Sequence, residues 1–118
     1  MKGPVARGGQ WEQVALEWLQ GKGWRLVERN YHCRLGEIDL IMRDADVLVF
    51  VEVRYRKSAG FGSAVESVDR RKQQKLLLAA RHYLRQWSGA EPVCRFDVVA
   101  ISGAGGSAIE WSEDAFGE

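Results

Sequence analysis

Apolar residues recur with helical spacing in two segments of the chain, residues 10–21 and 66–87. In the first segment they stand three or four positions apart and form one stripe, which is typical of an amphipathic helix. The stripe consists of Trp11, Val14, Ala15, Trp18 and Leu19. The second segment carries a similar stripe opposite a surface rich in Arg and Lys. Both segments are therefore predicted to be helices that each bury one face.

Short runs rich in β-branched and aromatic residues, bounded by turn-forming residues, predict strands in the rest of the chain. The strongest candidates are residues 36–43 and 47–55, on either side of the turn-forming sequence Asp-Ala-Asp. Further strands are predicted at residues 24–30, 94–101 and 108–111. The resulting order, α-β-β-β-α-β-β, predicts a single α/β domain over residues 1–118, with flexible ends at residues 1–9 and 112–118.

The faces of the hairpin formed by the two strongest strands favour one register, because a slip by one residue would turn every side chain to the wrong side of the sheet. Pairing Leu40 with Val51 gives one face of apolar pairs and places Asp39 opposite Glu52 on the other face. The remaining pairs are Glu37 with Arg54, Ile38 with Val53, Ile41 with Phe50 and Met42 with Val49. A shift by two residues keeps both faces and puts Glu37 beside Glu52. In either register two carboxylates lie together on an apolar hairpin.

Two facing carboxylates need a compensating partner. Directly opposed side chains have Cβ atoms about 4.5–5.5 Å apart, and like charges at this spacing destabilise a sheet. A divalent cation between Asp39 and Glu52 would remove the repulsion, because carboxylate oxygens are preferred ligands of Mg²⁺ and Mn²⁺. Protonation of one acid, or an ion pair with Arg54, would also remove it. Glu12, at the rim of the first helix, is either a third member of this group or a first-turn acid favoured by the helix dipole.

The composition excludes several classes of protein. With 46% hydrophobic residues and five tryptophans among 118 residues, the chain is not intrinsically disordered. It contains no run of about 18 apolar residues that would predict a membrane span. It also begins without an apolar leader, so we expect a cytoplasmic protein with no membrane partner. Two cysteines, Cys33 and Cys94, are too few for a disulfide framework.

Positive charge is unevenly distributed along the chain, although the net charge is only +1. The final nine residues hold four acids and no base, so the remaining residues hold 17 bases against 12 acids. Six of these bases fall in two clusters, Arg54, Arg56 and Lys57, and Arg70, Arg71 and Lys72. Such clusters suit a polyanion such as nucleic acid, and they equally suit a solvated surface.

Four segments match the pattern of a known family. They are GEIDLI at residues 36–41, VFVEVRYR at residues 49–56, Phe61-Gly62, and RFDVV at residues 95–99. Over roughly residues 8–112 the chain resembles the bacterial YraN family of the PD-(D/E)xK nuclease superfamily. The resemblance implies a restriction-endonuclease-like fold, a mixed central sheet flanked by helices, similar to archaeal Holliday-junction resolvases. It also implies a metal-dependent endonuclease for structured or branched DNA. The alternative is a non-catalytic DNA-binding or assembly module that keeps this fold.

The resemblance implies a cofactor, Mg²⁺ or Mn²⁺, and the residues of a site. The ligands would be Asp39, Glu52, Glu12 and the backbone carbonyl of Val53. Arg54 stands where the motif usually has lysine. Because arginine is not deprotonated in proteins, Arg54 would orient the attacking water or stabilise charge on the phosphate rather than act as a base.

The implied partner is DNA, branched or single-stranded. The residues expected to contact its phosphates are Arg56, Lys57, Arg70, Arg71, Lys72 and Lys75, each of which is otherwise part of a solvated surface. Analogy with resolvases, which cut two strands symmetrically, suggests a homodimer; the tryptophans Trp24, Trp87 and Trp111 either support it or belong to the core. Asp97, in an apolar strand, either supports the metal site or is a hydrogen-bonded structural acid.

Overall fold

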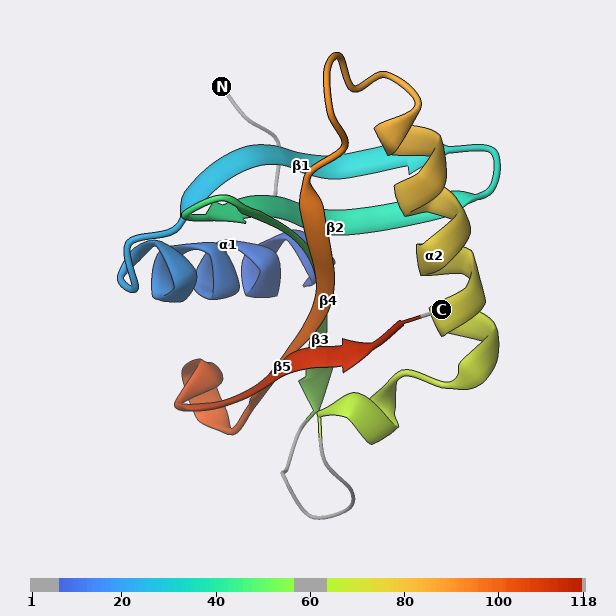
Figure 1. The fold of residues 1–118 in the computed structure, drawn as a ribbon. Helices are drawn as coiled ribbons and strands as arrows, with labels where there is room; N and C mark the ends of the chain where they lie inside the picture. Colours follow the sequence, from blue (N-terminus) through green and yellow to red (C-terminus); the bar gives the residue numbers. More distant parts are fainter. Residues whose placement is uncertain (1–6, 57–63, 118) are drawn as a thin grey trace, which may run out of the picture.

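A computed structural model describes residues 7–56 and 64–117 as a central sheet with a helix on each face (Figure 1). Its elements are α1 (Arg7–Gln20), β1 (Arg25–Cys33), β2 (Gly36–Asp44), β3 (Val47–Arg56), the 3₁₀ turn η1 (Val65–Ser67), α2 (Arg70–Leu84), β4 (Val93–Ser102), the 3₁₀ turn η2 (Ala104–Gly106) and β5 (Ala108–Phe116). Helices and strands follow each other in the predicted order.

The sheet is mixed and has the strand order β1-β2-β3-β4-β5. Neighbouring strands are antiparallel except β3 and β4, which run parallel. Parallel neighbours need a long crossover connection, and α2 provides it between β3 and β4. The predicted architecture, a mixed sheet flanked by helices, is confirmed, and it is consistent with a restriction-endonuclease-like fold.

Each helix covers one face of the sheet with its own apolar core. On one face α1 packs through Ala15, Leu16 and Leu19 onto Leu40, Met42, Val49, Val51, Val99 and Ile101. On the other face α2 packs through Leu76, Ala79 and Ala80 onto Ile41, Leu48, Phe50, Val98 and Ala100. The central strands β3 and β4 are therefore buried on both faces, which explains why residues 47–51 are apolar without a break.

The predicted hairpin register is confirmed over half of its length. Leu40 pairs with Val51, and the ladder continues regularly to the turn. The ladder ends at this pair, so the other predicted strand pairs, including Ile38 with Val53, do not form. Ile38 packs in the core beneath α2, whereas Val53 packs against the core of α1. The two strands separate at Asp39, whose Oδ2 accepts a hydrogen bond of 2.8 Å from the backbone N–H of Val53.

The second helix is shorter than predicted. Its first residue is Arg70, and the side chain of Asp69 caps it by accepting a hydrogen bond of 2.8 Å from the backbone N–H of Lys72. Residues 65–67 form a separate 3₁₀ turn, and α2 ends at Leu84. In the part of the chain that the structure describes, no helix is both long and apolar enough to span a membrane.

The last strand is longer than predicted. It continues past Trp111 to Phe116, so residues 112–116, which we expected in a flexible tail, belong to the sheet. The pairing of β4 with β5 is interrupted by a register shift between Phe96 and Val98. Asp114 lies at this shift with a positive φ of 51°. Such a bulge hides the period-two alternation by which a strand is found in a sequence.

Candidate functional site

Three acidic side chains meet where β2 and β3 separate. Glu12 comes from α1, Asp39 from β2 and Glu52 from β3. Glu52 follows Leu48 and Phe50 along β3 on the face covered by α2, whereas α1 covers the opposite face. Asp39 lies between the two glutamates and interacts with both carboxyls. Asp39 and Glu52 are thus neighbours in space, as predicted, although they do not form a strand pair, and Glu12 joins them.

Burial sets the protonation of this cluster. The exposed fractions of Glu12 and Glu52 are 9% and 3%. The pKa of Glu52 is raised to about 8, mainly by burial and then by repulsion from Asp39, while Lys72 and Arg54 act to lower it. Burial likewise raises the pKa of Glu12 to about 7, with repulsion from Asp39 and a hydrogen bond to it as the next causes. Near neutral pH the cluster therefore retains protons that ordinary carboxyls would lose.

Two oxygen atoms in this cluster have no hydrogen-bond partner. They are Glu12 Oε1 and Glu52 Oε1, and both are inaccessible to solvent. Leaving a buried polar atom unsatisfied costs about 1–3 kcal/mol, so native proteins rarely do so without a reason. Within the described residues, no three His, Cys, Asp or Glu side chains are already arranged to hold a metal ion. The contacts among the described residues therefore leave one carboxyl oxygen of each glutamate unsatisfied.

Two cations border the cluster, and the sequence indicated a role there for one of them. Arg54 Nη1 lies 3.5 Å from Glu52 Oε2, and Lys72 Nζ, on α2, lies 3.6 Å from the same oxygen. Lys72 was predicted only as a phosphate contact. The missed signal is its spacing: Lys72 precedes Leu76 by four residues and Ala79 by seven, so it continues the buried stripe of α2 toward the sheet.

The other predicted phosphate contacts do not gather at the acids. Arg70, Arg71 and Lys75 are exposed on α2. Arg56, at the end of β3, lies with Nη2 3.3 Å from Glu110 Oε1 on β5. Lys57 lies outside the described residues, as do Phe61 and Gly62 of the family motif.

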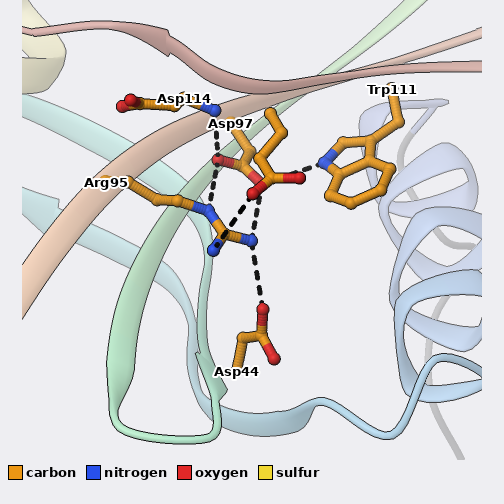
Figure 2. A network of polar contacts seen from close by, with 6 residues as sticks. Asp44, Arg95, Asp97, Trp111 and Asp114 are labelled. Carbon is orange, nitrogen blue, oxygen red and sulfur yellow. Dashed lines mark hydrogen bonds and ion pairs between the residues drawn. The ribbon is translucent and has the colours of Figure 1, made fainter.

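Asp97 is a structural acid. It is fully buried and accepts four hydrogen bonds, from Arg95 Nε at 3.0 Å, Arg95 Nη2 at 3.3 Å, Trp111 Nε1 at 2.9 Å and the backbone N–H of Asp114 at 3.0 Å. Figure 2 shows these groups converging on its carboxylate, with Arg95 also reaching Asp44 at 3.3 Å. None of these partners belongs to the acidic cluster. Asp97 thus ties the bulged part of β5 to β4 and to the β2–β3 turn.

Replacing Asp97 by Asn should strongly destabilise the fold. The change leaves Arg95, which is 13% exposed, without its closest counter-ion, and breaking a buried ion pair on one side costs about 3 kcal/mol. The melting temperature should fall by on the order of 10 °C in a thermal scan. Glu113→Gln is the matched control, because this acid also faces Arg95, at 3.6 Å, but is 55% exposed. Equal melting temperatures of the two variants would contradict the structural role of Asp97.

The stability of the cation-free protein should fall as pH rises from 5.5 to 7.5. Glu12 and Glu52 have folded-state pKa values of about 7 and about 8, above the ordinary 4.5. The folded state then binds more protons than the unfolded state. The stability that these two carboxyls contribute is therefore present in full below pH 4.5 and is lost as pH rises through the folded values. Urea unfolding in EDTA should show a loss of about 1.4 kcal/mol per pH unit for each proton involved. Glu52→Gln should reduce this slope; an unchanged slope would contradict the assignment.

Comparisons with known proteins place the chain in a family. The family model described as "Uncharacterised protein family UPF0102" matches residues 11–101. A "UPF0102 protein" of Nitrosococcus oceani is 54% identical over 112 residues, which cover 93% of this chain and 90% of that protein. A "UPF0102 protein" of Pseudomonas putida is 51% identical over 118 residues, covering 96% of this chain and 94% of that protein. These matches confirm the YraN resemblance at the level of the family, and the chain belongs to the UPF0102 family.

Proposed function

We propose that this protein is a metal-dependent endonuclease that hydrolyses phosphodiester bonds in structured or branched DNA. The observation that carries the proposal is the pair of unsatisfied, buried carboxylate oxygens of Glu12 and Glu52 on either side of Asp39. A fold would not retain such a cluster for stability, because burial and repulsion both disfavour its charged form. Binding of a cation by the cluster during function would explain why the fold keeps these three acids together.

The donor set suits Mg²⁺ or Mn²⁺. Carboxylate oxygens are the ligands these ions prefer, and Glu12, Asp39 and Glu52 would hold the ion, with the backbone carbonyl of Val53 as a further ligand. A divalent ion bound there lowers the pKa of a bound water and offsets negative charge on a phosphate. Binding has to displace the protons that Glu12 and Glu52 retain near neutral pH, so affinity should increase with pH.

The neighbouring cations have roles at the phosphate. Arg54 remains charged throughout the proposed reaction, because arginine is not deprotonated in proteins. It can therefore orient the scissile phosphate and stabilise the charge that develops on it, but it cannot take a proton from water. Lys72 contributes a second positive charge from α2, close to the same oxygen of Glu52. We infer that Lys72 takes the place of the lysine that the family motif usually carries at the position of Arg54.

The exposed bases of α2 extend positive charge away from the acids. Arg70, Arg71 and Lys75 are solvent-accessible on this helix, which also carries Lys72 beside Glu52. DNA phosphates on this surface would be held electrostatically, without readout of base sequence. This arrangement supports DNA as the substrate.

A homodimer that cuts two strands symmetrically remains part of the proposal. The tryptophans give it no support, because Trp24 and Trp111 pack with the core of α1 and Trp87 packs with the core of α2. Sedimentation at high protein concentration tests it directly. A protein that stays monomeric at every concentration, with and without DNA, would remove the dimer from the account.

A cleavage assay tests the proposed function. Branched, single-stranded and duplex DNA of matched sequence are incubated with the protein in Mg²⁺, Mn²⁺ or EDTA. We expect cleavage of at least the branched substrate with Mn²⁺ and none in EDTA. DNA binding without cleavage of any substrate in either ion would favour the non-catalytic binding module instead, and Arg54 at the lysine position is the residue that would account for it.

A further inference from the structure

A pocket separate from the acidic cluster lies between the β1–β2 turn and the first half of α2. Its volume is about 330 Å³, and its walls include Arg34 and Glu37 from the turn side and Lys72 and Lys75 from the helix. Gly36 allows the turn to approach the helix closely, since a Cβ at this position would lie 3.0 Å from the carbonyl oxygen of Lys75. Direct packing of turn against helix therefore fixes the walls of the pocket.

Positive charge without a counter-ion gathers in this pocket. Glu37 is the one acid in its lining, and its Oε2 lies 3.0 Å from His32 Nδ1. Arg34 and Lys75 have no carboxylate partner among residues 7–56 and 64–117. A concave surface with two such cations attracts an anion, because low-dielectric walls focus the field of both charges on the same space.

The pocket adjoins the acidic cluster through one residue. Lys72 lines the pocket, and its Nζ lies 3.6 Å from Glu52 Oε2. Phosphates recur along a DNA strand with about one charge per 3.4 Å of helix axis. A strand that presents one phosphodiester to the acids therefore carries further phosphates past Lys72 and toward Arg34 and Lys75.

We propose that this turn–helix pocket binds a backbone phosphate of the DNA strand other than the one that is cleaved, with Arg34 and Lys75 as its direct contacts. The proposal rests on the proposed function, because it takes DNA as the ligand. Arg34 offers paired N–H donors that match two phosphate oxygens, and Lys75 adds a point charge. Holding this phosphate sets which phosphodiester of the strand reaches Glu52. Arg34 was not among the contacts predicted from the sequence.

DNA binding in EDTA, followed by fluorescence anisotropy over a series of salt concentrations, tests the pocket. The variant Arg34→Ala/Lys75→Ala should bind about tenfold more weakly, and the slope of log K against log salt should fall by about one, because one phosphate contact is lost. Each single substitution should cost nearly as much as the double one, since both side chains hold the same phosphate. Arg34 and Lys75 are both exposed, so the melting temperature of the double variant should match that of the wild type.

The matched control is Arg25→Ala/Arg85→Ala, which removes the same charge at the start of β1 and just beyond the end of α2. It should bind within about twofold of the wild type. Equal losses in the two double variants, or no loss in the pocket variant, would overturn the proposal. Tight binding of inorganic phosphate alone, measured by calorimetry at constant ionic strength, would also overturn it, because the pocket would then serve a free anion.

Failure of the pocket and failure of the proposed function give different results. Pocket-dependent DNA binding by a protein that cleaves nothing in Mn²⁺ supports the pocket and removes the nuclease. Metal-dependent cleavage with DNA affinity unaffected by Arg34→Ala/Lys75→Ala supports the nuclease and removes the pocket. Absence of any DNA binding by the wild type overturns both.

Discussion

Asp39→Asn should lower the rate of DNA cleavage by at least about 10³-fold, because metal catalysis contributes several kcal/mol to such reactions and each 1.36 kcal/mol is a factor of ten. The substitution removes the charge at the centre of the cluster but keeps the oxygen that accepts the hydrogen bond from Val53. The loss should therefore appear without unfolding. Removing repulsion from Glu12 and Glu52 should even raise the melting temperature of the cation-free protein. Single-turnover cleavage in millimolar Mn²⁺, with a thermal scan in EDTA, measures both effects.

Asp46→Asn is the control for this variant. Asp46 is an exposed acid in the β2–β3 turn, at the end of the same hairpin that lies away from Asp39. Its loss should leave the cleavage rate within about twofold, because a distant exposed charge is screened by salt. Cleavage by Asp39→Asn at the wild-type rate would show that the acids are not the site. A lowered melting temperature would show that Asp39 serves mainly as the ion-pair partner of a cation.

Lys72→Met should lower the cleavage rate constant by about 10²-fold, the usual cost of removing one group that stabilises charge in a transition state. Lys72 Nζ lies 3.6 Å from Glu52 Oε2, beside the place where the phosphate would react. Because Lys72 also interacts with Glu52, its removal should change the affinity of the site for the metal. The rate is therefore measured at saturating Mn²⁺, with DNA affinity measured separately.

Arg71→Met removes the neighbouring charge of α2, which is exposed. It should weaken DNA binding about as much as Lys72→Met does but leave the rate constant of bound DNA nearly unchanged. Lys72→Arg should recover part of the rate, since arginine supplies the charge but not the same geometry. If Lys72→Met lowered only the affinity for DNA and left the cleavage rate constant unchanged, Lys72 would be an ordinary phosphate contact.

Much of the fold follows from the sequence because its apolar patterns are strong. The apolar stripes of residues 10–21 and 66–87 and the strand candidate at residues 47–55 predict a sheet with a helix on each side, which the structure has. The register of Leu40 with Val51 also follows, because a slip by one residue would expose a whole apolar face. These features depend on many residues that all indicate the same result.

The remaining features depend on single hydrogen bonds that a pattern does not reveal. Asp39 Oδ2 accepts the hydrogen bond from the backbone N–H of Val53 where β2 and β3 separate, and Ile38 lies in the core beneath α2. The side chain of Asp69 likewise caps α2, which begins at Arg70. Both contacts lie close to the site: the first is beside the acids, and the second is in the first turn of the helix that carries Lys72.

Calorimetric titration of Mn²⁺ into the cation-free protein at pH 7 tests the central claim that Glu12, Asp39 and Glu52 together bind a divalent cation. We expect saturable binding in the millimolar range or tighter. We also expect release of at least about one proton, seen as a dependence of the heat on the buffer, because Glu12 and Glu52 have pKa values of about 7 and about 8. Asp39→Asn should show neither effect. No saturable heat with the wild type, or the same isotherm with Asp39→Asn, would show that these three acids do not bind a divalent cation.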